Sequence, residues 1–257
     1  MNRINELFEK KSGNVLSIYF TAGYPTINST IEILKTLVSA GTDMIEIGVP
    51  FSDPLADGPV IQKSNLSALK NGMNLKLLFS QLQNIRREIN IPLLIMSYIN
   101  PILQFGMEEF CGKCEKTGID GVILPDLPPE VYMEEYSALF QSHHLNNILL
   151  ISPQTTAERI REIDKLSTGF VYVVSSSSTT GVKNGFSKEQ LEYFLRVRNM
   201  KLHNPGLIGF GISDHETYEL ACKYSNGAII GSTFIKMLDN DPGRIDRIRD
   251  FISSIRT

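Results

Sequence analysis

Short apolar runs alternate with longer segments of helical periodicity along the whole chain. The short runs are rich in β-branched residues and almost continuously apolar, which is typical of parallel strands covered on both faces. We predict eight strands, over residues 15–23, 43–49, 92–98, 121–127, 147–153, 170–176, 206–212 and 227–232.

The longer segments carry apolar residues at helical spacing, and several close with Gly or Asn as helices often do. They predict helices over residues 29–41, 76–90, 107–118, 130–144, 157–167, 188–200 and 215–225. An extra amphipathic helix is expected over residues 1–11, and a short helix is expected to begin near Ser232 after the last strand.

Eight strand-then-helix units in 257 residues match the count and size of a (β/α)8 TIM barrel of the α/β class. The alternative, an open doubly wound sheet, would be expected to carry a glycine-rich fingerprint after its first strand. Here residues 21–26 read TAGYPT, and no linker or shift in composition divides the chain. We therefore expect one catalytic domain over residues 1–257.

Composition narrows the functional classes. A hydrophobic content of 42% and a charged content of 21% are ordinary for a globular protein and do not favour disorder. The net charge of −3, with scattered Lys and Arg, does not favour nucleic-acid binding. No apolar stretch approaches the roughly 20 residues of a membrane span, and the N-terminus lacks the apolar centre of a secretion signal. We expect a cytoplasmic protein.

Cysteine and histidine patterns do not favour a metal site. Cys111 and Cys114 form a C-x-x-C pair, but it lies in a helical segment without a second pair or a neighbouring histidine. His143 and His144 are adjacent at the end of a predicted helix, where they point to different sides. A structural role is expected for the cysteines, and no metal is expected.

Two carboxylates at the second strand are the main candidates for chemistry. Glu46 lies inside an apolar run, where an unpaired charge costs several kcal/mol, and Asp57 follows in the next loop. One interpretation is an acid–base pair in which Glu46 has a raised pKa and Asp57 stays ionised. The other is a salt bridge from Glu46 to a neighbouring strand, with Asp57 supporting a turn.

Three glycine-bearing segments follow the last three strands, at residues 175–181, 209–213 and 229–232. Their backbone N–H groups, with the helix beginning near Ser232, predict a phosphate pocket that needs no Lys or Arg. Aromatic and large apolar residues occupy other strand ends: Tyr19, Met96, Tyr98, Tyr172 and Phe210. Together these features favour a substrate with a flat apolar part and a phosphorylated tail.

Residues 45–62, IEIGVPFSDPLADGPVIQ, closely resemble the signature of the tryptophan synthase alpha subunit family. The resemblance runs through nearly all of the chain, and its other segments are FTAGYP, MSYINPI, GVILPDLPPE, GFGIS and GAIIGSTFIK. It implies a reversible retro-aldol cleavage of indole-3-glycerol phosphate to indole and glyceraldehyde 3-phosphate in tryptophan biosynthesis.

The resemblance also assigns site residues. Glu46 matches the family's catalytic general acid and base, and Asp57 matches the aspartate that interacts with the indole N–H. The substrate pocket is implied at Tyr19, Ile61, Tyr98, Tyr172, Thr180 and Phe210, and the phosphate contacts at Gly181, Gly211, Gly231 and Ser232. The family's loop after strand six usually reads Ser-Arg-x-Gly-Val-Thr-Gly, whereas this chain has SSSSTTG, with Ser176 in place of the arginine. That departure puts lid closure and communication with a partner in doubt more than the chemistry.

The family pairs with a beta subunit that carries pyridoxal phosphate, so the resemblance implies an alpha2beta2 heterotetramer and no cofactor in this chain. Asp53, Pro54 and Pro101 are expected to be exposed at the barrel mouth and to contact that partner. Two alternatives stay open: a free-standing lyase that releases indole, and a weakly active chain that mainly regulates the beta subunit.

Overall fold

A computed structural model describes residues 2–175, 185–240 and 244–257. It contains a closed barrel in which each strand is parallel to both neighbours and β1 also pairs with β8. The strands are β1 (Val15–Thr21), β2 (Met44–Gly48), β3 (Leu93–Met96), β4 (Gly121–Ile123), β5 (Asn146–Ile151), β6 (Val171–Val174), β7 (Gly206–Gly209) and β8 (Gly227–Ile230). The predicted barrel and all eight predicted strands are confirmed, although most strands are a few residues shorter than expected.

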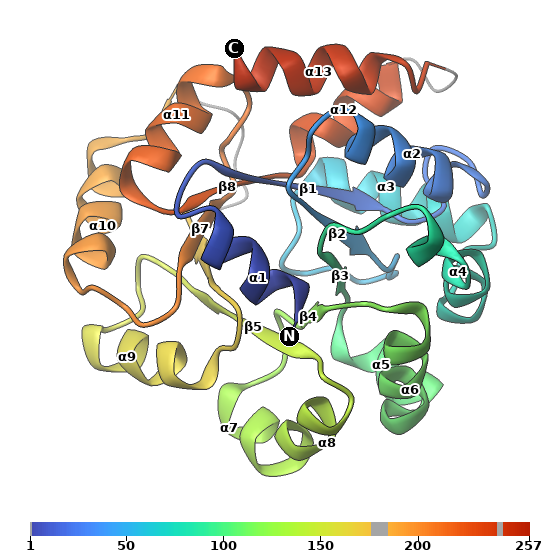
Figure 1. The fold of residues 1–257 in the computed structure, drawn as a ribbon, viewed down its shortest axis with the longest axis horizontal. Coiled ribbons are helices and arrows are strands. Elements are labelled where there is room, and N and C mark those ends of the chain that lie inside the picture. Colours follow the sequence, from blue (N-terminus) through green and yellow to red (C-terminus); the bar gives the residue numbers. More distant parts are fainter. Residues whose placement is uncertain (1, 176–184, 241–243) are drawn as a thin grey trace.

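Helices surround this ring of strands (Figure 1). They are α1 (Arg3–Lys10), α2 (Ser29–Ser39), α3 (Pro59–Lys70), α4 (Leu75–Leu82), η1 (Ile85–Arg87), α5 (Ile99–Phe105), α6 (Met107–Thr117), α7 (Pro129–Val131), η2 (Tyr132–Tyr136), α8 (Ser137–Ser142), α9 (Ala157–Leu166), α10 (Lys188–Asn199), α11 (His215–Tyr224), α12 (Ser232–Asn240) and α13 (Arg247–Arg256). The sequence pattern did not single out α3, although Pro59 stands at its first position, where proline is favoured. The predicted helix over 130–144 contains a π-helical segment, η2.

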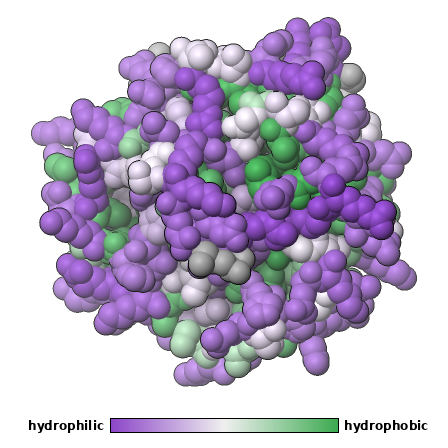
Figure 2. Space-filling model, viewed as in Figure 1, coloured by the Kyte–Doolittle hydropathy of each residue, from purple (hydrophilic) through white to green (hydrophobic). Residues whose placement is uncertain are grey.

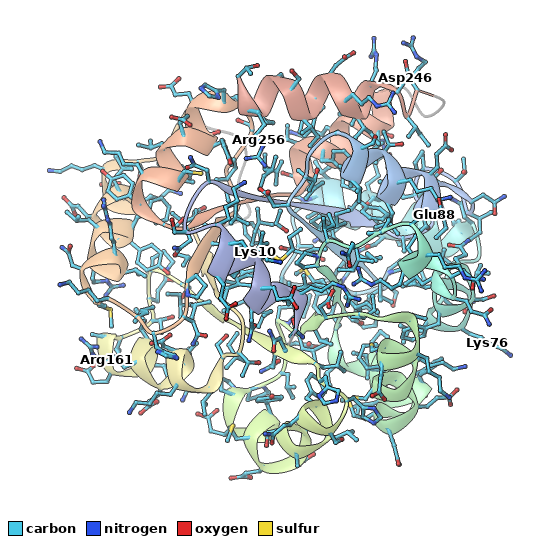
Figure 3. The ribbon with its side chains drawn as sticks, viewed as in Figure 1. Lys10, Lys76, Glu88, Arg161, Asp246 and Arg256 are labelled. Carbon is cyan, nitrogen blue, oxygen red and sulfur yellow. The ribbon has the colours of Figure 1, made fainter. Side chains whose placement is uncertain are left out.

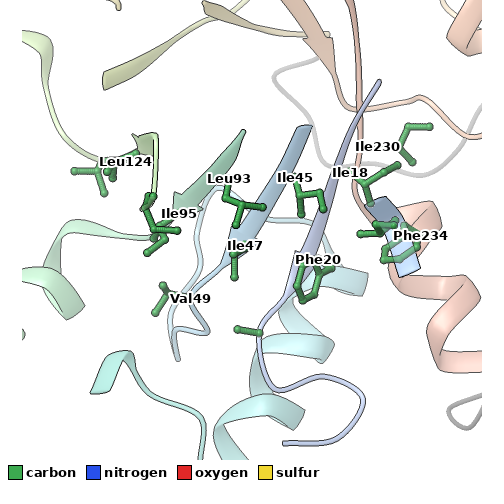
Figure 4. Packing of buried hydrophobic residues seen from close by; sticks show 14 of the residues in the cluster. Ile18, Phe20, Ile45, Ile47, Val49, Leu93, Ile95, Leu124, Ile230 and Phe234 are labelled. Atoms are coloured by element: carbon green, nitrogen blue, oxygen red, sulfur yellow. The ribbon is translucent and has the colours of Figure 1, made fainter. Parts of the chain in front are cut away.

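Alternation along the strands separates two layers of core. Outward-facing side chains, including Ile18, Ile45 and Ile95, pack against the surrounding helices (Figure 4). Inward-facing side chains form a second cluster that includes Met44, Leu94, Ile148 and Leu207. Because both faces of each strand are buried, the strands read as apolar runs, and a polar residue inside one stands out.

Helix α1 lies across the middle of the ring of strands (Figure 1). Its Ile4 is fully buried in the inner cluster, and Phe8 packs against Phe170 with 6.1 Å between ring centroids. Buried Asp120 links the start of α1 to the start of β3, since its carboxylate accepts from Arg3 Nη1 at 2.9 Å and from the Leu93 N–H at 2.9 Å. The end of the barrel at which the strands begin is therefore closed, and a ligand must enter at the other end.

Charged and other polar residues cover most of the face that α1 crosses (Figure 2). Arg256, labelled in Figure 3, ties α13 to the loop before β2 through a 2.6 Å ion pair with Asp43. None of the helices in the described parts of the chain is long and apolar enough to cross a membrane.

Candidate active site

Glu46 lies in the middle of β2, on the inner face of the barrel, and is fully buried. Its Oε1 accepts a hydrogen bond from Ser17 Oγ on β1 at 2.8 Å. Its Oε2 has no hydrogen-bond partner among the described residues. The ion pairs in the described parts of the chain do not include Glu46, so the salt bridge considered from the sequence is absent there.

Burial determines the protonation of Glu46. Loss of hydration in the barrel interior raises the pKa of its carboxyl to about 8, and the hydrogen bond from Ser17 opposes part of that rise. At pH 7 the carboxyl is therefore mostly neutral and can act as an acid.

Asp57 lies in the loop between β2 and α3 and is also buried, with 5% of its surface exposed. Burial raises its pKa to about 6, while the hydroxyl of Tyr98, donating to Asp57 Oδ2 at 3.3 Å, lowers it. The sequence predicted only that Asp57 is the looser carboxylate of the pair and stays ionised. The loop instead folds inward, because Tyr98 Oη also accepts from the Ala56 N–H at 2.9 Å and the Tyr98 ring stacks on Phe51.

Tyrosine side chains wall the site on two sides. Tyr19 stands opposite Glu46 in the β1–β2 ladder, and Tyr172 on β6 packs edge-on against Phe210, which follows β7. Burial raises the pKa values of both phenols well above the usual range, and the nearby Asp57 and Glu46 carboxyls add to the rise. These aromatic side chains and the two carboxyls therefore occupy one region inside the barrel.

Gly48 and Gly209 make room for these tyrosines, a role that the sequence analysis did not assign to either glycine. A Cβ on Gly48 would lie 2.2 Å from the Tyr19 hydroxyl oxygen, and one on Gly209 would lie 2.3 Å from that of Tyr172. Such distances exclude any side chain unless the ring moves. The sequence signal that could have identified these glycines is a glycine at an inward position of one strand and a tyrosine at an inward position of the strand before it.

Ile61 on α3 and Gly231 after β8 complete this side of the pocket. A Cβ on Gly231 would stand 3.3 Å from Tyr19 Cδ1 and 3.7 Å from Ile61 Cδ1. Farther along, Lys63 of α3 pairs with Asp239 of α12 at 2.7 Å. The helix that follows the Asp57 loop is thus joined to the helix that begins at Ser232.

Two of the three predicted phosphate-binding segments lie next to each other. Gly211, after β7, has a φ of 76°, a left-handed conformation that favours glycine. The Thr233 hydroxyl donates to the Ile212 carbonyl at 3.4 Å, which connects this segment to the first turn of α12. Ser175 Oγ donates to the Phe210 carbonyl at 2.7 Å. Thr180, Gly181 and the rest of residues 176–184 lie outside the described residues.

The three residues predicted to contact a partner at the rim of the barrel mouth are only partly exposed as expected. Asp53 is exposed as predicted and Pro101 is half-buried, but Pro54 is buried, so its predicted exposure is wrong. The reason is local: the turn in which the Asp57 N–H donates to the Pro54 carbonyl at 3.0 Å folds this proline inward. Leu55, at 91% exposure, and Leu103 on α5, at 49%, are exposed apolar residues of this rim that the sequence analysis did not name.

Metal-ligating geometry is absent from the described part of the chain, where no group of three or more His, Cys, Asp or Glu is placed to hold an ion. Cys111 and Cys114 are buried free thiols on α6, and burial raises the pKa of Cys111 to about 12. Their thiols pack as small apolar groups, which agrees with the structural role predicted for them.

Two surface cavities lie away from the carboxyl pair. One of about 730 Å³ borders Arg3, His143 and Lys165 beside α1, and another of about 330 Å³ lies between α10 and α11. Neither contains Glu46 or Asp57. We expect the active site at the carboxyl pair, because both carboxyls are buried and have raised pKa values.

Comparison with known proteins identifies the family of the chain. The family model described as tryptophan synthase alpha chain matches residues 6–254. The tryptophan synthase alpha chain of Flavobacterium psychrophilum is 55% identical, over 99% of this chain and 100% of its own length. That of Flavobacterium johnsoniae is 54% identical over the full length of both.

A solved structure of tryptophan synthase subunit alpha from Legionella pneumophila shares the fold with a TM-score of 0.90 and 32% identity, covering 100% of this chain and 97% of the other. A second, of tryptophan synthase from M. tuberculosis in its aminoacrylate-bound form, gives a TM-score of 0.87 and 27% identity over 100% of this chain and 98% of that one. The chain belongs to the tryptophan synthase alpha chain family.

Proposed function

We propose that Glu46 and Asp57 divide the proton transfer and charge stabilisation of the reaction that this chain catalyses. As a member of its family the chain is the lyase subunit that cleaves indole-3-glycerol phosphate to indole and glyceraldehyde 3-phosphate in tryptophan biosynthesis. The observation that supports the two roles is the pair of buried carboxyls with pKa values of about 8 and about 6, on either side of neutrality.

The cleavage begins with neutral Glu46, which donates its proton to C3 of the indole ring. The ring then carries a positive charge centred on its nitrogen, and ionised Asp57 accepts the N–H and stabilises that charge in a low-dielectric site. Glu46, now a carboxylate, takes the proton of the glycerol hydroxyl next to the ring. The carbon–carbon bond breaks, its electron pair returns to the ring, an aldehyde forms, and Glu46 is again neutral.

Substrate binding divides between two parts of the barrel mouth. Tyr19, Ile61, Tyr98, Tyr172 and Phe210 hold the indole ring. The backbone N–H groups near Gly211, Gly231 and Ser232 hold the phosphate, with the N-terminus of α12 adding its partial positive charge. The family resemblance in addition assigns a substrate contact to Thr180 and a phosphate contact to Gly181.

Gly211→Val is expected to raise KM for indole-3-glycerol phosphate by about tenfold or more and to weaken indole binding much less. At a φ of 76° a β-branched residue is strained, so the backbone must move away from the phosphate. Calorimetric titration of glycerol phosphate and of indole measures the two effects separately.

The matched control is Gly41→Val, since Gly41 has a φ of 88° and lies before β2, at the opposite end of the barrel. It should share any loss of stability but keep both affinities. Unaltered glycerol phosphate affinity in Gly211→Val, or an equal loss for both ligands, would show that the phosphate lies elsewhere.

The partner proposed for this chain is a beta subunit that carries pyridoxal phosphate and consumes the indole, in an alpha2beta2 complex in the cytoplasm. The alpha chain would work as one domain over residues 1–257 and without a cofactor of its own. The exposed rim formed by Asp53, Leu55 and Leu103, with Pro101 beside it, lies close to Asp57 and would be covered by that subunit.

Asp53→Ala is expected to weaken the complex and the activation of each subunit by the other, by about three- to tenfold, because an exposed charged contact contributes modestly. The fold and basal activity of the isolated chain should not change. The measurements are affinity for the beta subunit and the ratio of activities with and without it. Asp250→Ala, which removes an exposed carboxylate of α13, is the control, and equal behaviour of the two variants would contradict this interface.

The direct test of the function is release of indole from indole-3-glycerol phosphate by the isolated chain, followed by gel filtration with and without the beta subunit. Cleavage with complex formation supports the proposal. Cleavage without complex formation would favour the free-standing lyase, and complex formation without cleavage would favour the regulatory alternative.

A further inference from the structure

Ser17 is a polar residue in the middle of a largely apolar strand, and the reaction as described so far does not use it. It is fully buried, and the ladder of β1 and β2 pairs Ser17 with Met44 and Tyr19 with Glu46. Ser17 is therefore one inward-facing position nearer the closed end of the barrel than the Tyr19–Glu46 pair. Its hydroxyl meets the carboxyl of Glu46 diagonally, across two adjacent strands.

The two oxygens of Glu46 are unequal as a result. Oε1 accepts the proton of Ser17 at 2.8 Å, whereas Oε2 is buried and has no hydrogen-bond partner in the described parts of the chain. A buried carboxyl oxygen without a partner is unusual in a folded protein, and its natural partner in an enzyme is the substrate.

The same contact determines which oxygen carries the proton when Glu46 is neutral. A serine hydroxyl has one proton, and among the described residues the only acceptor recorded for that of Ser17 is Glu46 Oε1. If Oε1 were protonated and donated to Ser17 instead, both the serine proton and Oε2 would be buried without a partner, whereas a proton on Oε2 leaves only that one O–H without an acceptor until substrate binds. The acidic proton therefore resides on Oε2.

We propose that Ser17 is a positioning residue for Glu46, which holds the plane of its carboxyl and leaves the transferable proton on Oε2. The inference rests on the proposed role of Glu46 as the acid and base. It adds to that role a specific reacting oxygen and the residue that selects it.

The surroundings of Glu46 make this hydrogen bond its main source of stabilisation as an anion. Among the described residues, the titratable groups that interact with it are Tyr19 on β1 and Tyr172 on β6, and Asp57 in the loop after β2 interacts with the same two tyrosines. None of these is a cation, and no ion pair of Glu46 exists within the described ranges. Because Ser17 donates to the ionised form, its removal raises the pKa of Glu46 further.

The test is Ser17→Ala in the full chain, with kcat, KM and the pH profile measured for indole release. We expect kcat to fall about tenfold with little change in KM, and the alkaline limb of the profile to move up by about half to one pH unit. Titration of the Glu46 carboxyl by carbon-13 NMR should show the same upward shift without relying on catalysis.

Ser167→Ala is the matched control, since Ser167 is a buried serine whose hydroxyl donates to the Phe170 carbonyl at 2.7 Å, before β6. It should leave the profile unmoved. Ser17→Cys keeps nearly the same size and offers a weaker donor, so its profile should lie between those of the native chain and Ser17→Ala. It also provides the comparison if the alanine variant does not fold.

The proposal would be overturned if, in the folded Ser17 variants, the alkaline limb of the pH profile and the NMR titration of the Glu46 carboxyl both stay at their native positions. That failure is distinct from failure of the proposed function. If Glu46→Gln is inactive while Ser17→Ala keeps the native profile, Ser17 has no positioning role. If Glu46→Gln is active, the assignment of Glu46 itself is wrong.

Discussion

Replacing Glu46 with glutamine should lower the turnover of indole-3-glycerol phosphate by at least 10²- to 10⁴-fold, the range typical of an acid–base group. Glutamine has nearly the same shape and can still accept from Ser17 Oγ, so the pocket should persist. It cannot release or take a proton at the position of Oε2. Steady-state indole release measures the effect, and near-native activity would remove Glu46 from the mechanism.

The same variant should be more stable than the native chain at neutral and alkaline pH. The pKa of Glu46 is about 8 in the folded chain and 4.5 for an unperturbed glutamate, so the folded state holds the proton more tightly than the unfolded state. Native stability therefore falls as pH rises from about 4.5 to about 8, by roughly 3 kcal/mol at pH 7. Glutamine does not have to ionise and avoids this loss.

Urea unfolding at pH 5 and pH 8 measures this difference, which should be small at pH 5 and larger at pH 8. Asp164→Asn is a useful control, because Asp164 is a buried carboxylate that accepts from the backbone N–H groups of His203 and Asn204, before β7. Its loss should reduce stability while leaving kcat close to native. A gain in stability with full activity lost would identify Glu46 as a residue kept for function rather than for folding.

Asp57→Asn should reduce turnover by about 10²- to 10³-fold, since a neutral amide cannot stabilise a positive indole in a low-dielectric site. Asparagine keeps the size of the side chain, so substrate affinity should change much less than kcat. Wild-type activity requires Asp57 ionised, above its pKa of about 6, and Glu46 protonated, below about 8. The native pH profile should therefore be a bell between these values.

The profile of Asp57→Asn should lose its acidic limb and keep its alkaline limb. Tyr98→Phe is the graded comparison, because it removes the hydroxyl that donates to Asp57 Oδ2 at 3.3 Å and accepts from the Ala56 N–H at 2.9 Å, but leaves the charge of Asp57 in place. We expect a smaller loss of turnover and an acidic limb displaced to higher pH, since the hydroxyl donates to the ionised form. An acidic limb that persists unchanged in Asp57→Asn would show that another group controls it.

Local pattern was sufficient to predict the barrel. The eight strands follow from short apolar runs, and their order follows from alternation with helices, both of which are properties of neighbouring residues. Glu46 could be singled out in the same way, because a charge inside a buried strand is visible without any knowledge of what surrounds it. The resemblance in residues 45–62 then supplied the chemistry.

Tertiary structure alone decided which contacts position the side chains of the site. The Ser17–Glu46 hydrogen bond joins residues 29 positions apart, and the fit of Tyr19 to Gly48 and of Tyr172 to Gly209 depends on the register of adjacent strands. The inward position of Asp57 depends on Tyr98, which is 41 positions farther along the chain. Such contacts form only when the barrel closes and brings distant parts of the chain together. The pKa values of Glu46 and Asp57 follow from these contacts, because a pKa depends on burial and on the distance to neighbouring groups in space rather than on separation along the chain.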